Sequence, residues 1–329
     1  MGSSNCRQWG SVIVVLRHVS PSTLKTYLTC PTRFYFAKVL GWEKFEPFDG
    51  ELSGSRFGDL IHAVLKVWGT DLAAREIADA KMLQACWRAL LQQEVETRFG
   101  TTVSPLIRLQ IMSAEERLMA LAGKQVEQHQ QGWRIVEVEK ELNGVLTLAG
   151  LPVHMTVDRI DRHTDGRMRV IDYKTGKSVE DPRKAHLRAW SEEKCPTPLA
   201  RVCVVKSNGK GRDKSHIWTD LQLPLYVAAV QKAWNLDAMP EAFYALLPSA
   251  VGDTRFVPFA ELSEMIPNAI EWAEEATRRI LAGVFWPPAP EVKPDDLAAL
   301  APEGLEPVLR TEWAKLLSGT TAGQRGSAI

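Results

Sequence analysis

The chain has 329 residues, of which 45% are hydrophobic and 24% charged, values typical of a soluble globular protein. They exclude a disordered, collagen-like or disulfide-scaffold chain, and the length suits one elaborated domain or two modest ones. Forty Lys and Arg balance forty Asp and Glu, so a nucleic-acid site, if present, must be a local basic patch rather than a property of the net charge.

Two further features bear on location and redox chemistry. The longest apolar run near the start, Val12 to Leu16, is too short for a secretory signal, and no later run is long enough to span a membrane. The five cysteines are odd in number and are never spaced as C-x-x-C, which argues against a disulfide framework or a zinc site. We therefore expect a cytoplasmic protein without membrane contact.

The predicted elements change in character along the chain. Ser20-Pro21 predicts the start of a helix, and apolar spacing near 3.6 predicts further helices at about 55–68, 72–99 and 105–131. From Trp133 to Tyr173 the residues alternate and predict a β-meander. We then expect, in order, a charged loop at about 176–216, a helix at 218–234, a strand at 242–247, a helix at 259–281 and a proline-rich tail.

The meander ends in a hairpin whose second strand places Asp172 and Lys174 on one face. A three-residue loop at 164–166 would put Asp158 opposite Asp172, with Cβ atoms about 5 Å apart, whereas a two-residue loop would put Asp158 opposite Tyr173. Two carboxylates this close repel unless a cation or a shared proton lies between them, and Mg²⁺ suits such a site. The alternative is a solvated strand end with an Asp–Lys ion pair.

The sequence of this hairpin resembles the catalytic hairpin of the PD-(D/E)XK nuclease superfamily, in its RecB-like branch. The strings that carry the resemblance are Val157-Asp158-Arg159-Ile160-Asp161 and Ile171-Asp172-Tyr173-Lys174. Two more segments look like the G-x-x-x-H and Q-x-x-x-Y helices of that branch, namely Gly58 to His62 and Gln222 to Tyr226. The opening from Ser20 to Phe36 is also similar to its first helix.

The resemblance implies an α/β fold, with a restriction-endonuclease-like mixed central sheet flanked by helices and an N-terminal helical insertion. It implies one nuclease domain at 18–290, with the insertion at about 69–131 and the catalytic core at about 132–290. An N-terminal extension at 1–17 would precede this domain, and a proline-rich acidic tail at 291–329 would follow it.

The resemblance further implies metal-dependent phosphodiester hydrolysis with one or two Mg²⁺ or Mn²⁺ ions. The metal ligands that it implies are His62, Asp158 and Asp172. Lys174 would position or activate the attacking water and stabilise the transition state. The last two catalytic residues that it implies, Gln222 and Tyr226, would hold the nucleic-acid backbone or the water in line.

Several of these residues also have structural explanations. A lone histidine at helical spacing is more often a core residue than a ligand, and Gln222 and Tyr226 alone would make an ordinary polar helix edge. Asp161 falls on the strand face opposite Asp158, so we expect it to form a salt bridge with an arginine. The preceding strand carries alternating acids that favour a solvated face, although one could approach the metal: Glu137, Glu139 and Glu141.

A basic segment between Arg201 and His216 is the candidate contact for nucleic acid. Its glycines predict a flexible loop, which is either merely solvated or binds phosphates. Its place between Lys174 and the Q-x-x-x-Y helix favours phosphate binding. The residues that we expect to bind are Lys206, Lys210, Arg212 and Lys214.

Cys30 lies where some relatives have the first of four iron–sulfur ligands, but residues 286–313 contain no cysteine. We therefore predict no iron–sulfur cluster. The sequence predicts a Mg²⁺- or Mn²⁺-dependent DNA nuclease, an exonuclease in DNA repair, recombination or mobile-element processing, with DNA and a helicase or recombination protein as partners. The alternative is a non-catalytic nuclease-fold module that binds DNA or docks to a helicase.

Overall fold

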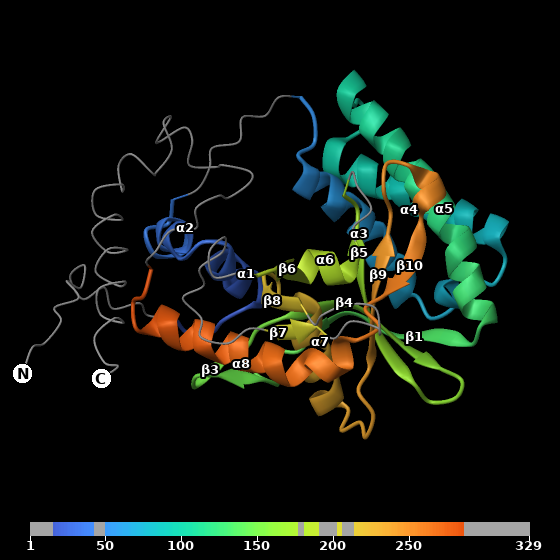
Figure 1. The fold of residues 1–329 in the computed structure, drawn as a ribbon. Coiled ribbons are helices and arrows are strands. Elements are labelled where there is room, and N and C mark those ends of the chain that lie inside the picture. The colour runs from blue at the N-terminus through green and yellow to red at the C-terminus, as the bar shows by residue number, and fades with distance from the viewer. Residues whose placement is uncertain (1–15, 43–49, 177–180, 191–202, 206–213, 286–329) are drawn as a thin grey trace, which may run out of the picture. The chain divides into compact units, whose positions relative to one another are not determined.

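The computed structural model describes residues 16–42, 50–176, 181–190, 203–205 and 214–285 (Figure 1). The chain forms two compact units. The larger comprises Leu16–Lys25 and Pro47–Thr277, and it contains every described residue that the sequence assigns to the active site. The described part of the smaller unit comprises residues 26–42 and 278–285.

A five-stranded mixed sheet forms the centre of the larger unit. Its strands, in spatial order, are β1 (Trp133–Glu141), β4 (Thr156–His163), β5 (Met168–Lys174), β9 (Glu241–Leu246) and β10 (Arg255–Pro258). Strands β5 and β9 are parallel, and the other neighbours are antiparallel. The predicted meander is confirmed as β1, β4 and β5, whereas the four-residue β10 was too short to be predicted.

The hairpin between β4 and β5 has a three-residue loop, one of the two loop lengths that the sequence left open. The His163 N–H donates to the Arg167 carbonyl at 2.8 Å, and Arg159 pairs with Ile171. The same register, continued by one residue, places Asp158 opposite Asp172. Gly166 in the loop has a φ of +96°, a conformation that other residues rarely adopt. The register expected for a three-residue loop is therefore confirmed.

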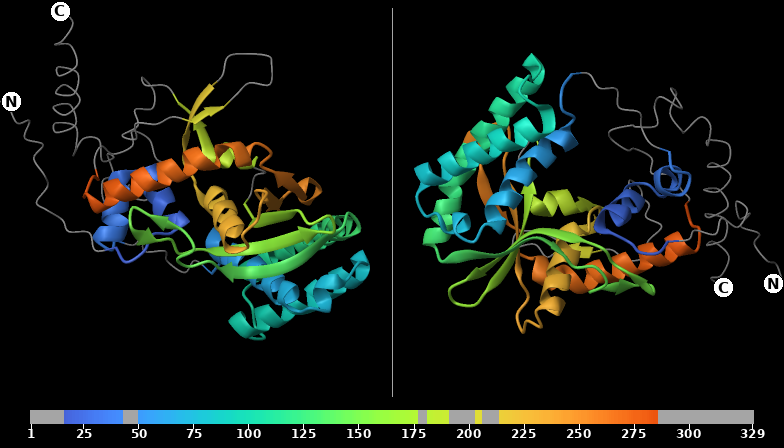
Figure 2. Two further views of the ribbon diagram at one scale, coloured as in Figure 1. Left: turned by 90° about the horizontal axis from the view of Figure 1, so that it is seen from below. Right: turned by 180° about the vertical axis from the view of Figure 1, so that it is seen from behind.

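Helices cover both faces of the central sheet (Figure 2). One face carries α3 (Gly54–Thr70), α4 (Ala80–Phe99) and α5 (Pro105–Gln130), and the other carries α7 (Gln222–Ala233) and most of α8 (Leu262–Leu281). The helix expected from about residue 72 begins only at Ala80. That start is set by Asp79, whose side chain accepts the Met82 N–H and caps the helix.

The main core lies between α3, α4, α5 and the sheet. Its largest side chains are Trp68 and Trp87, which are almost fully buried and meet edge to face at 5.0 Å between ring centroids. Arg117 of α5 donates to the carbonyl of Thr175 at 2.7 Å and to that of Leu247 at 3.1 Å. Because these residues follow β5 and β9, Arg117 ties together the strand ends next to Lys174.

The expectation of a plain loop at 176–216 was wrong for its described residues. They contain α6 (Pro182–His186) and the antiparallel strands β6 (Leu187–Ala189), β7 (Cys203–Val205) and β8 (Lys214–Trp218), in the order β6-β8-β7. Strands β6 and β7 have three residues each, too few to show an alternating pattern. A second small hairpin, β2 (Thr147–Leu148) and β3 (Leu151–Pro152), lies between β1 and β4.

The smaller unit contains the end of α1 (Pro21–Thr29), α2 (Pro31–Phe34) and a π-helix at Tyr35–Val39. Within it, the Tyr27 hydroxyl donates to the Val284 carbonyl at 2.6 Å, and the Thr32 hydroxyl donates to the Phe285 carbonyl at 2.7 Å. Among the helices that the structure describes, none combines the length and apolar character needed to cross a membrane.

Candidate active site and metal centre

Helix α3 presents His62 at the edge of the sheet. The Ser53 side chain caps the helix, and its apolar face, including Ile61 and Leu65, is buried in the core. His62 lies beside that face, with 30% of its side chain exposed. A Cβ atom at Gly58 would lie 3.1 Å from the Thr175 hydroxyl, so this glycine lets the helix approach the end of β5 closely.

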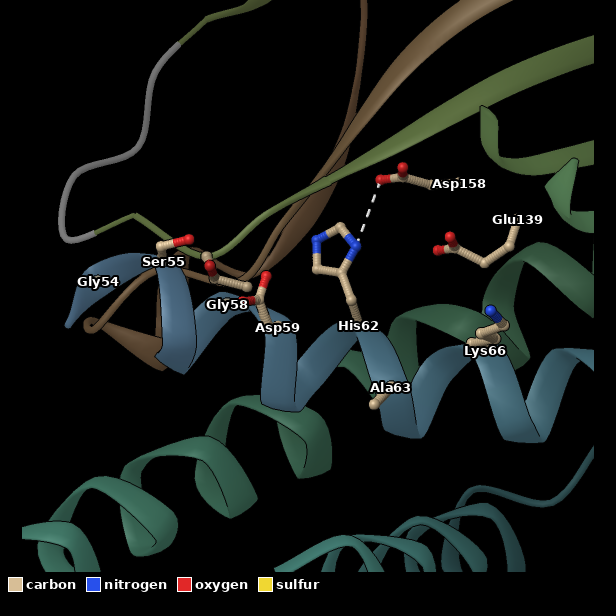
Figure 3. Close-up of a pocket in the computed structure, with 10 residues that line it drawn as sticks. Gly54, Ser55, Gly58, Asp59, His62, Ala63, Lys66, Glu139 and Asp158 are labelled. Atoms are coloured by element: carbon tan, nitrogen blue, oxygen red, sulfur yellow. Dashed lines mark ion pairs between the residues drawn. The ribbon is translucent and has the colours of Figure 1, made fainter. Parts of the chain in front are cut away.

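The hydrogen bonds of His62 fix which ring nitrogen carries the proton. Its Nε2 lies 3.3 Å from the Tyr173 carbonyl oxygen. Because a carbonyl can only accept, Nε2 is the donor and Nδ1 carries a lone pair in the neutral ring. Nδ1 lies 3.7 Å from Asp158 Oδ2, too far for a hydrogen bond (Figure 3). A metal-binding histidine typically has this arrangement, with its other nitrogen donating to a carbonyl.

Glu139 of β1 is brought to the same place by a β-bulge. The register between β1 and β4 shifts by one between Ile135 and Glu137, which leaves Val136 as an extra residue. Beyond the bulge, the register places Glu139 opposite Asp158. Glu139 has a φ of +46°, an unfavourable value for a non-glycine residue and one that is often found at functional sites.

Three potential ligand atoms therefore converge from three elements, one atom each from His62, Glu139 and Asp158. These atoms all lie within 4.8 Å of one another, and each residue is half-buried. They line a pocket of about 460 Å³, the His62 pocket, into which Lys66 also projects (Figure 3). One imidazole nitrogen and carboxylate oxygens suit a divalent cation such as Mg²⁺ or Mn²⁺.

A chain of polar contacts, an ion pair followed by two hydrogen bonds, runs from Asp172 to helix α7. Lys174 Nζ lies 2.7 Å from Asp172 Oδ2 and 3.2 Å from Gln222 Oε1, to which it donates. The Gln222 amide then donates to the Tyr226 hydroxyl at 3.0 Å. Gln222 is itself held by Asp220, whose carboxylate accepts its backbone N–H at 2.8 Å. The lysine is thus fixed by neighbours on both sides.

The electrostatics of this cluster are dominated by its carboxylates. Burial, together with the charge of Asp172, raises the pKa of Asp158 well above its usual value. Burial alone would lower the pKa of Lys174, but the Asp172 carboxylate outweighs it and the pKa rises. Burial also raises the pKa of Tyr226, so its phenol stays protonated at neutral pH. Lys174 is therefore a cation and a hydrogen-bond donor at neutral pH.

The structure brings most of the expected site residues together. His62 and Asp158 belong to the converging ligand group, while Asp172, Lys174, Gln222 and Tyr226 form the adjoining chain. The Asp172 carboxylate contacts Lys174 and is not part of the ligand group, so metal binding by Asp172 stays a prediction. Glu139 was considered only as one of three alternating acids, because nothing in the sequence announces the bulge.

The expected salt bridge of Asp161 is confirmed. Asp161 accepts hydrogen bonds from Arg159 and Arg169 on the opposite face of the hairpin, and Tyr173 packs there in the buried core. Of the expected nucleic-acid contacts, only Lys214 lies within the described part, where it is exposed on β8. Those outside the described residues are Lys206, Lys210 and Arg212.

Residues 18–190 match the family model of the PD-(D/E)XK nuclease superfamily. This range includes His62, Glu139 and the whole β4–β5 hairpin but ends before Gln222. The chain therefore belongs to the PD-(D/E)XK nuclease superfamily, and the central mixed sheet with flanking helices is its restriction-endonuclease-like fold. Its fold implies a nucleic-acid substrate, and nucleases of this superfamily use divalent metal ions.

Among solved structures, a provisionally named exonuclease from Eubacterium rectale is similar to this chain. The two chains are 13% identical, with a TM-score of 0.45, and the match covers 88% of this chain and 90% of the other. No curated protein matches the sequence.

The side chains present fit a divalent metal ion. Asp59, Glu139, Asp158 and Asp172 supply four carboxylates against the ammonium groups of Lys66 and Lys174. When all are ionised, the excess of two negative charges equals the charge of one divalent cation. The lone pair on His62 Nδ1 also faces a carboxylate rather than a donor. Both features are accounted for by a cation bound between His62 and Asp158.

Proposed function

We propose that this protein is a metal-dependent DNA nuclease of the RecB-like type that hydrolyses phosphodiester bonds. One observation carries the proposal: His62 Nδ1, Glu139 and Asp158 converge beside a lysine that is held by Asp172 and Gln222. A lysine next to a metal ligand set suits hydrolysis of a phosphodiester, because negative charge develops on the phosphate in the transition state.

The residues have separate roles in this proposal. His62, Glu139 and Asp158 would hold the metal, with Asp172 as a further ligand. A bound divalent ion supplies a water of lowered pKa and neutralises charge on the scissile phosphate. Lys174, protonated at neutral pH, would donate to a phosphate oxygen or orient the water rather than remove its proton.

The second part of the site would orient Lys174 and the bound nucleic-acid strand. Asp172 and Gln222 hold the Lys174 ammonium by contacts of 2.7 and 3.2 Å, so little side-chain freedom is lost when substrate binds. Tyr226 accepts a hydrogen bond from Gln222 and keeps its own proton. Its hydroxyl would donate a hydrogen bond to the nucleic-acid backbone. We assign Lys206, Lys210, Arg212 and Lys214 to phosphate contacts on sequence grounds.

The broader assignments also belong to the proposal. We propose a single nuclease domain at 18–290, Mg²⁺ or Mn²⁺ as the metal and no iron–sulfur cluster. We propose exonuclease action in DNA repair, recombination or mobile-element processing, in the cytoplasm. The RecB-like motifs and the absence of cysteine at 286–313 support these assignments.

The test is cleavage of linear and circular DNA, single- and double-stranded, and of matching RNA, with Mg²⁺, Mn²⁺ or EDTA. We expect DNA cleavage with metal, none in EDTA, and preference for linear substrates. Lys174→Met should lower the rate by roughly 10²–10³-fold, the usual loss for one charge-stabilising donor. Lys232→Ala, an exposed lysine in the last turn of α7, should cleave like the wild type.

Other outcomes of this assay have distinct meanings. Cleavage of circular DNA at the same rate would indicate an endonuclease, and cleavage of RNA alone would overturn the assignment to DNA. If no condition gives cleavage but DNA still binds, the chain is a non-catalytic module of the nuclease fold, and the proposal of enzymatic activity is wrong.

A further inference from the structure

A second pocket is connected to the proposed catalytic lysine through Gln222 and Tyr226. It has a volume of about 550 Å³, and Gln222 and Tyr226, the last members of the chain from Lys174, form part of its lining. The pocket is large enough for a nucleotide-sized ligand. Its place next to Gln222 and Tyr226 makes it part of the surface that a substrate bound at Lys174 would cover.

The charges of this pocket do not suit a phosphate. Its only ammonium among the described lining residues is that of Lys25, which is paired with Asp220 at 2.8 Å. Asp220 is buried, with 3% of its side chain exposed, so Lys25 is needed to neutralise it. The third charged lining residue is Glu141, another carboxylate. A phosphate would therefore meet an excess of negative charge.

The remaining lining suits a neutral, planar group with hydrogen-bonding edges. His154 lines the pocket, and its ring is stacked on His18 with 4.1 Å between centroids and 6° between planes. Hydroxyl groups of Ser20, Thr156 and Tyr226 also line it. Glu141 accepts the Asn143 amide at 3.3 Å, which leaves most of its acceptor capacity for a ligand. A nucleobase has these properties, with amino donors at its edge and two stacking faces.

The stacked histidines are held rigidly by the backbone. The Val19 N–H donates to the Pro152 carbonyl at 3.1 Å, and the His154 N–H donates to the Val19 carbonyl at 2.8 Å. These two bonds join the residues next to His18 and His154 in a parallel bridge. Because these bonds fix the main chain at both residues and the two rings stack on each other, a base that stacks on His154 would meet a partly ordered surface.

We propose that this second pocket binds a nucleobase of the substrate strand near the scissile phosphate, with His154 as the stacking surface and Glu141 as the acceptor for an exocyclic amino group. The inference rests on the proposed nuclease function, since it places the base relative to Lys174. A base can enter such a pocket only when it is unpaired. The enzyme would therefore act on single strands or on frayed duplex ends.

The test measures binding of short fluorescent single strands by anisotropy, in EDTA and in Ca²⁺, with or without bases at the central positions. The wild type should bind the strand with bases at least about fivefold more tightly than the abasic strand, the lower limit for base–aromatic stacking. His154→Ala should lose this preference, and His154→Phe should keep it because it retains an aromatic face. His129→Ala, a histidine on α5 that contacts Glu76, should match the wild type.

The same assay tests the role of Glu141. Strands of adenine or cytosine carry an amino group that thymine lacks, so the wild type should bind them more tightly, and Glu141→Gln should reduce that difference. Equal binding of base-containing and abasic strands, or no binding of either, would overturn the inference. Because these measurements need no cleavage, base-dependent binding by a protein that never cleaves would leave the inference standing while the proposed nuclease function failed.

Discussion

The two faces of the β4–β5 hairpin are both charged and buried, yet their charges are arranged in opposite ways. On one face Asp161 lies between two arginines, and its oxygens accept from Arg159 at 2.6 and 2.8 Å and from Arg169 at 2.8 and 3.0 Å. On the other face Asp158 and Asp172 lie opposite each other, and Lys174 forms an ion pair with Asp172. In the first set both carboxylate oxygens accept from arginines, whereas in the second the two carboxylates outnumber the one ammonium group on that face of the hairpin that contacts them.

The difference shows how burial of charge can serve structure or function in neighbouring residues. Each side chain of the Asp161 set is about 1% exposed or less, and Arg169 also stacks on Trp133 at 4.0 Å. Burial lowers the pKa of Arg169 to about 10, and the charge of Asp161 opposes a further fall, so the arginine stays protonated at neutral pH. A carboxylate that is paired with cations of the protein therefore indicates a structural role, and carboxylates in excess of the cations around them indicate a site for a bound cation.

The largest expected effect is loss of stability on breaking the Asp161 set. Asp161→Asn would leave Arg159 and Arg169 buried without a counterion, so the free energy of unfolding should fall by about 3–5 kcal/mol. Urea denaturation followed by circular dichroism measures this change. Asp253→Asn, at an exposed residue 4.0 Å from its arginine, is the control and should change stability by less than about 0.5 kcal/mol. Equal losses in the two variants would contradict a structural role for Asp161.

The hairpin was predictable because local chemistry limits its register. The sequence left two loop lengths open, and Gly166 suits the left-handed position of the three-residue loop; the loop length then fixes which residues face each other. The long helices were predictable for a similar reason, since their apolar spacing repeats over many turns. Strands β6, β7 and β10 were not, because each has only three or four residues, too few to show a period.

The site residues that belong to short sequence motifs were predictable. The one that depends on an irregularity of the folded sheet was not. His62, Asp158 and Lys174 were assigned from strings of four or five residues. Glu139 depends on the bulge at Val136, which shifts the pairing of the second half of β1 by one residue. No glycine or turn residue marks that bulge. The sequence therefore shows three alternating acids without showing which of them faces Asp158.

The second prediction tests the excess of carboxylates directly. A divalent metal that binds the folded protein and not the unfolded chain should raise the free energy of unfolding by about 2.7 kcal/mol at a free concentration one hundred times its dissociation constant. Titration of the EDTA-treated protein with Mn²⁺, followed by thermal or urea unfolding, measures this gain. Asp158→Asn should abolish it. A gain that survives in this variant would place the metal elsewhere.

The third prediction concerns the ligand that the sequence did not single out. Glu139→Gln removes one of the three converging ligands, and we expect at least about a tenfold weaker affinity for Mn²⁺, or about 1.4 kcal/mol. Isothermal titration calorimetry measures the change. Glu137→Gln is the matched control on the same strand, because Glu137 pairs with Lys140 at 2.9 Å and is not in the ligand group. Equal weakening by both variants would remove Glu139 from the metal site.

The smallest expected effect is a gain in stability when the charge of Asp158 is removed from the metal-free protein. Burial and Asp172 raise the pKa of Asp158 above its usual 3.8. The folded protein therefore binds this proton more tightly than the unfolded chain does, and its stability falls as the pH rises from about 3.8 through the raised pKa. Asp158→Asn lacks this loss and still offers an oxygen to the Tyr173 N–H.

In EDTA, the Asp158→Asn variant should therefore become more stable than the wild type as the pH rises from about 3.8 through the raised pKa of Asp158. The gain should reach at most about 1 kcal/mol, because that is the cost of like charges that face each other across a hairpin. Urea denaturation in buffers from acid to neutral pH measures the difference, with Asp253→Asn as the variant whose curve should follow the wild type. A difference that stays constant or narrows would mean that the Asp158 charge is already compensated within the protein, as that of Asp161 is. The two faces of the hairpin would then no longer differ in the way that points to a metal.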